Sequence, residues 1–222
     1  MDSYIDAELE AVDIGHVTVP PFGISMDGNQ TCMLRAAKIA IDSLSPGDDF
    51  VYIEFGIARG DTINAMSRCI LQMGVEAKRL KVTGVDLENG WSLDREYLGG
   101  YSKDWPFKHE FSFLGSTGFL ELYHGKIDYL LIDGCHEKSC ATDDFVKSEP
   151  FVRVGGIVAF HDSDDISQSV QPQPHRGEPI AVRGALDSLG LLDGTRLGWK
   201  KLCDIEALPG NHGIAIFKKV AA

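Results

Sequence analysis

The chain has 222 residues, of which 44% are hydrophobic and 24% charged, and its formal net charge at pH 7 is −12. This length and composition predict one soluble globular α/β domain with a sizeable core. The acidic balance disfavours a nucleic-acid backbone or an anionic membrane as the main partner. No apolar stretch approaches the roughly 20 residues that span a bilayer.

The N-terminus and the cysteines both indicate a cytoplasmic location. Residues 1–6 are acidic and lack the basic and apolar regions of a signal peptide. The cysteines are five in number and include no C-x-x-C pair, so we expect free thiols in a reducing compartment. The acidic surface is compatible with a homodimer but does not require one.

Residues 1–45 are predicted to form an N-terminal segment that ends in a helix, ahead of a main domain at residues 46–222. Apolar residues recur at helical spacing from Thr31 to Leu44, and the Ser-Pro-Gly-Asp run at residues 45–48 ends the helix. The residues before Thr31 have little regular pattern. This segment is expected either to cover the cleft of the main domain or to form a loose tail.

The central stretch, residues 51–60, has the pattern of a buried strand followed by a glycine turn into a helix. This order places backbone N–H groups and a helix N-terminus at the carboxyl edge of a sheet, where open α/β folds bind ligands. Gly56 allows a sharp turn, and Gly60 allows a ligand to approach the backbone. Glu54, at the strand end, offers a carboxylate to a ligand hydroxyl.

The glycine spacing in this stretch is E-x-G-x-x-x-G, whereas the dinucleotide fingerprint G-x-G-x-x-G needs a third glycine. The pattern resembles motif I of the class I S-adenosylmethionine (SAM) dependent methyltransferases, in which the turn wraps the methionine part of the cofactor. An ordinary tight turn without a ligand can have the same glycines, so residues later in the chain must distinguish a cofactor-binding turn from an ordinary one.

The second strand is predicted at residues 80–87, and Asp86 lies near its end. Beside the first turn, Asp86 can accept both hydroxyls of a ribose, although a solvated loop aspartate has the same pattern. Aromatic residues within 88–108 either line a pocket for the adenine or the acceptor, or hold a long loop against the surface. A third strand is predicted at residues 109–114. In the methyltransferases the end of this strand lies against the adenine, which makes Ser116 a candidate contact.

Two further predicted strands each lead to an aspartate and a histidine. A buried strand at residues 127–132 leads to Asp133 and then His136, and a second strand ends in His161 and Asp162. We expect the two carboxylates to converge at the carboxyl edge of the sheet. Paired carboxylates suit a hard cation such as Mg²⁺, and an ion on an acceptor hydroxyl lowers its pKa.

The run I-D-G-C-H, an aspartate eight residues after the histidine, and G-G-I-V-A-F-H-D together resemble the Methyltransferase 24 family, which includes macrocin-type sugar O-methyltransferases. The match covers residues 51–164, about half of the chain. It implies a single domain with a doubly wound, mostly parallel seven-stranded sheet and one antiparallel strand near the C-terminus. It also implies SAM as cofactor, with contacts from Glu54, Gly56, Gly60, Asp86, Ser116 and Asp133.

By the same resemblance, Asp133 is a metal ligand, His136 the general base, and Asp162 part of the metal shell. Where the macrocin-type enzymes carry another carboxylate beside Asp162, this chain has His161. Imidazole is a poor ligand for Mg²⁺ and a good one for Mn²⁺, Fe²⁺ or Zn²⁺. His161 is therefore either a metal ligand or a side chain that points into the sheet, because neighbours on a strand face opposite sides.

The function expected is SAM-dependent methylation of a hydroxyl on a small molecule, such as a sugar or natural product, with Mg²⁺ or Mn²⁺ as the candidate ion. An NAD-dependent oxidoreductase is an alternative because Asp86 suits its ribose as well. A non-catalytic protein that retains the fold is another. The proline-rich residues 168–180 are either a lid that selects the acceptor or a surface loop.

Overall fold

The computed structural model describes residues 3–18, 27–57, 60–86, 108–112, 120, 123, 125–163, 181–205 and 213–221. The predictions about Ser116, the aromatic residues at 91–106 and the segment 168–180 lie outside these residues. No helix in the described ranges is long and apolar enough to cross a membrane.

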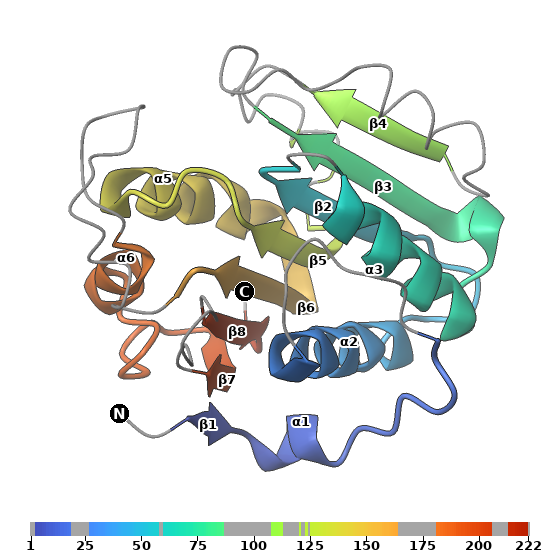
Figure 1. Cartoon of the computed structure of the whole chain (residues 1–222), viewed down its shortest axis with the longest axis horizontal. Helices are drawn as coiled ribbons and strands as arrows, with labels where there is room; N and C mark the ends of the chain where they lie inside the picture. Colours follow the sequence, from blue (N-terminus) through green and yellow to red (C-terminus); the bar gives the residue numbers. More distant parts are fainter. Residues whose placement is uncertain are drawn as a thin grey trace.

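One mixed sheet organises the chain (Figure 1), in the order β1-β7-β8-β6-β5-β2-β3-β4. Its strands are β1 (Tyr4–Ile5), β2 (Phe50–Phe55), β3 (Leu80–Val85), β4 (Lys108–Ser112), β5 (Ile127–Ile132), β6 (Val152–His161), β7 (Trp199–Ile205) and β8 (Ile214–Lys219). The strands from β4 to β6 pair in parallel, and β8 runs antiparallel to both of its neighbours.

The predicted α/β fold, with a mostly parallel sheet and one antiparallel strand near the C-terminus, is confirmed. The described sheet has eight strands where seven were expected. The additional strand is β1, which pairs antiparallel with Cys203 and Asp204 at the edge of β7. Such a two-residue strand leaves no periodic signal in the sequence, because its pairing depends on a partner about 200 residues away.

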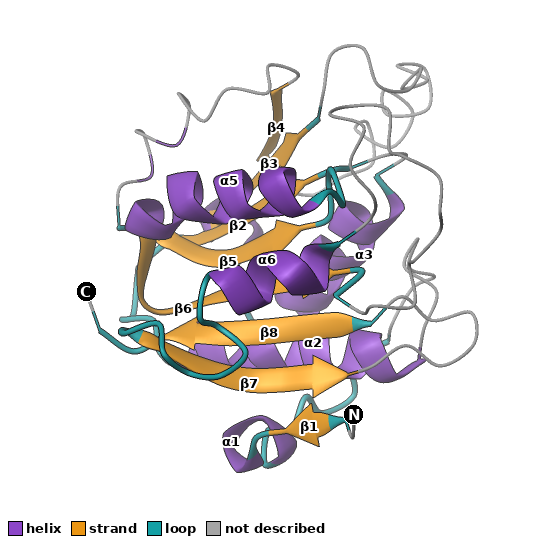
Figure 2. Ribbon diagram, turned by 90° about the vertical axis from the view of Figure 1, so that its left-hand side faces the viewer, coloured by secondary structure: helices purple, strands orange, loops and turns teal. Residues whose placement is uncertain are grey.

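Helices cover both faces of the sheet (Figure 2). They are α1 (Ala7–Glu10), α2 (Asp27–Asp42), α3 (Asp61–Gln72), α5 (Lys138–Ser148) and α6 (Val182–Ser188), with short 3₁₀ turns η1 (Ala77–Arg79) and η3 (Glu149–Phe151). Residues of α2 and α3 share one apolar core with alternate strand residues, and residues of α5 and α6 share the other. All six residues of β2 are buried, which explains why this strand is a continuous apolar run.

Helix α2, which was predicted at the end of the N-terminal segment, belongs to the apolar core. Helix α2 starts four residues before the predicted position, and its residues Met33, Leu34, Ala37 and Ala40 are fully buried. The core on this face therefore includes part of the segment 1–45. That this segment also covers the cofactor cleft remains a prediction.

Helix α3 follows the predicted course after the glycine turn. It begins after Gly60, whose φ of 83° is in the left-handed region, and it buries Ile63, Met66 and Ile70 on one face. The N-terminus of α3 is thereby placed next to the end of β2, at the carboxyl edge of the sheet.

Candidate active site

The carboxyl ends of β2, β5 and β6 lie side by side. Parallel pairing aligns Phe55 with Ile132 and Ile132 with Phe160, so each strand ends at the same level. Asp133 follows β5 directly, and His161 and Asp162 come at the end of β6. The predicted convergence of Asp133 and Asp162 is present, because parallel strands bring their ends to one edge.

Two carboxylates and two imidazoles meet at this edge; Asp133, His136, His161 and Asp162 are called the Asp–His cluster below. Nδ1 of His161 lies 2.8 Å from Oδ1 of Asp133 and 3.3 Å from Oδ1 of Asp162. Nε2 of His136 lies 3.4 Å from Oδ1 of Asp133, and its Nδ1 lies 3.0 Å from Oδ2 of Asp162. Each imidazole therefore faces both carboxylates.

The electrostatics of the cluster stabilise the ionised form of Asp133 and the charged form of each imidazole. Burial opposes the ionisation of Asp133, but the charge of His161 and the hydrogen bonds of both histidines lower the pKa of Asp133 below its ordinary value. Burial also opposes charge on His136 and His161, yet the two aspartates outweigh it and raise the pKa of each imidazole. These are the shifts expected when opposite charges share a site shielded from water.

Asp162 has an unusual backbone. Its φ of 54° lies in the left-handed region, and it is the one residue other than glycine with a positive φ in the described part of the chain. Successive residues of a strand face opposite sides, so a regular continuation would separate Asp162 from His161. The left-handed turn brings both side chains into the cluster. Such strain at a polar site is typical of functional positions.

Gly56 is required by the close approach of two strands. Its φ is 82°, and a Cβ at this position would overlap the carbonyl oxygen of Asp133 and Cα of Gly134. The Asp133 amide donates to the Phe55 carbonyl at 2.9 Å, and the Gly56 amide donates to the Val85 carbonyl at 2.8 Å. Gly56 therefore allows the end of β5, which carries Asp133, to lie directly against the turn.

Glu54 lies deeper than its place at a strand end suggested. Its side chain is buried, and it accepts a hydrogen bond from the Tyr52 hydroxyl. Burial raises the pKa of Glu54 well above its ordinary value, and the negative charges of Asp133 and Asp86 raise it further. Three of the predicted cofactor contacts thus share one electrostatic environment, with Asp86 partly buried at the end of β3.

Two tyrosines beside this site were not predicted. Tyr52 and Tyr129 are paired across β2 and β5, with ring centroids 5.7 Å apart. The Tyr129 hydroxyl is buried and has no hydrogen-bond partner among the described residues. Both residues occupy the same face as Glu54 because they lie at alternate positions of paired strands. A tyrosine two residues before a strand-end glutamate was the available signal.

The donor atoms of Asp133, His136 and Asp162 all lie within 4.8 Å of one another. Two carboxylates and an imidazole at this separation fit a divalent cation. Donor atoms of Cys135, Glu137 and Cys140 form a second group of the same compactness nearby in the chain.

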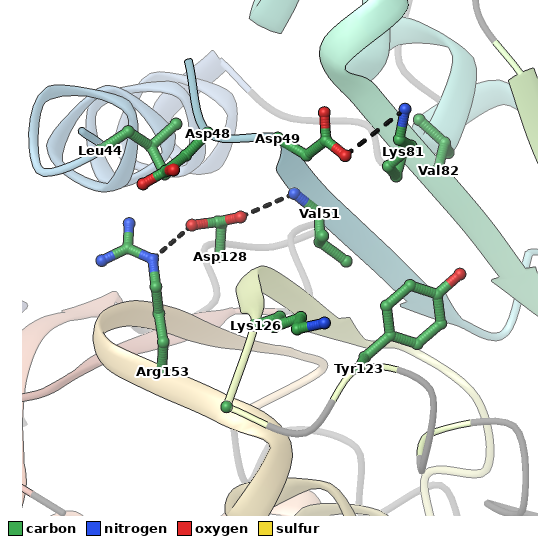
Figure 3. Close-up of a pocket in the computed structure, with 11 residues that line it drawn as sticks. Leu44, Asp48, Asp49, Val51, Lys81, Val82, Tyr123, Lys126, Asp128 and Arg153 are labelled. Atoms are coloured by element: carbon green, nitrogen blue, oxygen red, sulfur yellow. Dashed lines mark hydrogen bonds and ion pairs between the residues drawn. The ribbon is translucent and has the colours of Figure 1, made fainter. Parts of the chain in front are cut away.

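A cavity of about 760 Å³ lies at the opposite, amino edge of the sheet (Figure 3). Val51, Lys81 and Asp128, near the beginnings of three strands, line it together with Arg153. The Arg153 guanidinium is committed to Asp128 and to backbone and hydroxyl oxygens around it. None of the predicted site residues lines this cavity, so it is separate from the Asp–His cluster.

A family model matches the part of the chain that forms this edge. Residues 53–163, half of the chain, match a family model described as a methyltransferase domain. This range begins in β2 and ends just after Asp162, so it contains the glycine turn and the whole cluster. No curated protein matches the chain.

Several solved structures have a similar fold. A putative O-methyltransferase from Klebsiella pneumoniae is 15% identical with a TM-score of 0.58, covering 97% of this chain and 91% of that chain. The O-methyltransferase TomG from Streptomyces achromogenes, determined in complex with SAM, is 12% identical with a TM-score of 0.54, covering 89% and 82%. A putative caffeoyl-CoA O-methyltransferase from Staphylococcus aureus is 15% identical with a TM-score of 0.57, covering 89% and 86%. At these identities the likeness shows the fold alone.

Proposed function

The chain belongs to the methyltransferase domain family that its residues 53–163 match, and from this premise we propose that it methylates a hydroxyl group of a small molecule. It is a class I SAM-dependent methyltransferase. The observation that carries the choice of a hydroxyl acceptor is the Asp–His cluster, because a hydroxyl must lose a proton during transfer. The O-methyltransferases with a similar fold agree with this choice.

The cofactor is proposed to lie across the ends of β2, β3 and β5. Gly56 and Gly60 form the turn around its methionine part, and Asp86 accepts hydrogen bonds from its ribose. Glu54, Asp133 and Ser116 complete the proposed contacts. Carboxylates at this edge favour binding of a sulfonium, because it carries a positive charge.

Methyl transfer is an in-line displacement, so the enzyme mainly positions the two reactants. The acceptor oxygen forms a bond to the methyl carbon, the carbon–sulfur bond breaks, and the sulfonium becomes a neutral thioether. The hydroxyl proton passes to the cluster. We propose that His136 receives it in its neutral form. Asp162, 3.0 Å from Nδ1, orients the ring, and the carboxylates that raise the pKa of His136 make the neutral ring a stronger base.

A divalent ion such as Mg²⁺ or Mn²⁺ is proposed to assist, held by Asp133 and Asp162 with an imidazole. When bound, such an ion lowers the pKa of the acceptor hydroxyl and orients it. Asp133 then acts on both the ion and the cofactor side, which explains its central place in the cluster.

Further proposals concern the cover of the cleft, the acceptor, the location of the protein and its partners. Residues 1–45 are proposed to cover the cleft, and the acceptor is proposed to be a sugar or another natural product. A cytoplasmic location agrees with the free cysteines among the described residues. The net charge of −12 disfavours a nucleic-acid acceptor, and a homodimer is compatible with it.

Calorimetric titration of the full chain with SAM and, separately, with NAD⁺ tests the proposed function. We expect micromolar binding of SAM, no binding of NAD⁺, and at least tenfold weaker SAM binding after Asp86→Ala. Binding of NAD⁺ alone would support the oxidoreductase alternative. Binding of SAM without transfer to any hydroxylated acceptor in a panel read by mass spectrometry would support a non-catalytic protein.

A further inference from the structure

We infer that Cys135, Glu137 and Cys140, called the cysteine cluster below, form a binding site for Zn²⁺ that is separate from the Asp–His cluster. Cys135 lies in the turn after β5, Glu137 caps the N-terminus of α5, and Cys140 lies in the first turn of that helix. The inference does not depend on methyl transfer, because it concerns other side chains and is tested by ion binding alone.

The donor atoms of the cysteine cluster are close enough to share one ion. One donor atom from each residue lies within 4.8 Å of the other two. The Cys135 thiol donates to the Cys140 sulfur, and the Cys140 thiol donates to Oε2 of Glu137 at 3.9 Å. Around tetrahedral Zn²⁺, with bonds of about 2.3 Å to sulfur and about 2.0 Å to oxygen, neighbouring ligands lie roughly 3.5–3.8 Å apart. Binding therefore needs only small movements of the side chains and the loss of the thiol protons, which a coordinating cation removes.

Burial and access also fit an ion at this place. Glu137 is fully buried, whereas Cys135 and Cys140 are half-buried. Two thiolates and a carboxylate repel one another when all are ionised, and a cation among them offsets that repulsion. Because the two sulfur ligands are partly exposed, the ion can enter from solvent and keep a water as its fourth ligand.

The cysteine cluster and the Asp–His cluster alternate along the chain without sharing a side chain. His136 lies 3.0 Å from Asp162, whereas its chain neighbours Cys135 and Glu137 belong to the cysteine cluster. The donor atoms also differ in kind, because thiolates select soft ions such as Zn²⁺, whereas carboxylates suit harder ions such as Mg²⁺ and Mn²⁺. The two clusters are therefore expected to bind different ions.

Contact between two thiols is not sufficient for such a site. Cys32 and Cys203 also form a thiol–thiol hydrogen bond, and both are buried. Among the residues that the structure describes, no third donor completes a metal-binding group around them. This second pair of thiols supplies a control from the same chain.

The experiment is titration of the fully reduced, metal-free full chain with Co²⁺ as a spectroscopic substitute for Zn²⁺. Thiolate bound to Co²⁺ gives a charge-transfer band in the near ultraviolet, which the carboxylate and imidazole ligands of the Asp–His cluster do not give. We expect this band to appear and to vanish when Zn²⁺ displaces Co²⁺. Mg²⁺ at roughly millimolar concentration should leave the band unchanged, because it prefers oxygen ligands.

Three variants test the ligands. Cys135→Ser and Cys140→Ser should each reduce the band to about half or less and weaken Co²⁺ binding at least about tenfold. Glu137→Gln keeps both thiols and the shape of the side chain, so the band should still form while the Kd for Co²⁺ rises at least about tenfold. Cys32→Ala is the matched control and should change neither the band nor the Kd.

Asp162→Asn separates this inference from the proposed function. Asparagine tolerates a left-handed backbone, so the variant removes a charge from the Asp–His cluster and should lose activity while the band persists. Circular dichroism checks that each variant is folded. Absence of the band in the unaltered reduced protein would overturn the inference, as would an unchanged band in both serine variants or an unchanged Kd in Glu137→Gln. Loss of the band in Asp162→Asn would assign the ion to the Asp–His cluster and also overturn it.

Discussion

The two ends of β5 each carry an aspartate that faces a cationic side chain, yet they differ in what the partner can do. Asp128 is the second residue of β5 and is 1% exposed, whereas Asp133 follows the last residue of the strand. Both belong to buried or partly buried ion pairs. Comparing them separates a structural ion pair from a reactive one.

At the amino end of β5, both carboxylate oxygens of Asp128 accept hydrogen bonds. One oxygen of Asp128 accepts the Val51 amide at 2.7 Å, and the other accepts from Arg153. Arg153 also donates to the Ala40 carbonyl and the Ser43 hydroxyl, both at 2.9 Å. A guanidinium stays charged at any physiological pH, so this pair has one state and joins β2, β5, β6 and α2.

At the carboxyl end of β5, the partners of Asp133 are imidazoles, whose charge can change. Imidazole gains or loses its charge near neutral pH, and it can bind a proton or a metal ion through the same nitrogen. Asp133 shares His136 and His161 with Asp162, whose backbone is in a sparsely populated conformation. The difference shows that the partner, more than the burial of the aspartate, decides whether a charge pair supports the fold or the chemistry.

The largest expected effect is on activity, from Asp133→Asn. This change keeps the shape of the side chain but removes the charge that both imidazoles face, so we expect kcat to fall about 10²–10⁴-fold. The melting temperature should change by only a few degrees. Steady-state kinetics and thermal unfolding measure the two effects. Unchanged kcat would place the chemistry elsewhere.

The matching change at the amino end, Asp128→Ala, should act on stability. It leaves the partly buried Arg153 guanidinium without a carboxylate and the Val51 amide without its acceptor, which together cost about 3–5 kcal/mol in the free energy of unfolding. Urea unfolding measures this loss, and the kcat of the remaining folded enzyme should stay within about twofold. A stable variant with lost activity would reverse the assignment of the two ends.

Gly56→Ala tests whether the carboxyl end depends on close strand contact. The added methyl group would overlap the backbone at Asp133, and the positive φ adds strain, so we expect a loss of about 1–3 kcal/mol and weaker SAM binding. Gly74→Ala is the matched control, because Gly74 has a φ of 104° but open space around its Cβ position. Equal losses in both variants would mean that strain alone explains Gly56.

The smallest effect concerns a partly buried group of ion pairs that joins the N-terminal segment to the sheet. Lys200 lies 2.8 Å from Asp6 and 2.9 Å from Glu8, and Lys218 lies 2.6 Å from Glu8. The hydrogen bonds of these lysines lower the pKa of Asp6 and of Glu8 below their ordinary values of 3.8 and 4.5. A lowered carboxyl pKa stabilises the fold above the ordinary value and ceases to do so as the pH falls through the lowered one.

We therefore expect Lys200→Met to destabilise the protein by about 0.5–1 kcal/mol at pH 7, because solvent screens these charges. The difference from the unaltered protein should shrink as the pH falls below about 4.5, the ordinary pKa of Glu8, toward pH 3. Urea unfolding at several pH values measures it. A difference that is constant with pH would show that Lys200 contributes through its aliphatic stem instead of its charge.

The sequence by itself determined the order of strands and helices around the site. Hydrophobic runs, glycine turns and helical spacing are local patterns, so they located β2, α3, β5 and α5 to within a few residues. They also predicted that Asp133 and Asp162 meet, because parallel strands end at one edge of the sheet. The match of residues 53–163 to the methyltransferase domain family confirms the family that the sequence motifs predicted.

The tertiary structure alone decided how the side chains at that edge are arranged. The left-handed backbone of Asp162 turns both it and His161 toward Asp133, and no local pattern marks such a conformation in a residue other than glycine. The burial of Glu54 under Tyr52 and the contact of Gly56 with the end of β5 depend on strand pairs far apart in sequence. Register and burial are set by these distant partners, whereas periodicity is a property of the neighbouring residues.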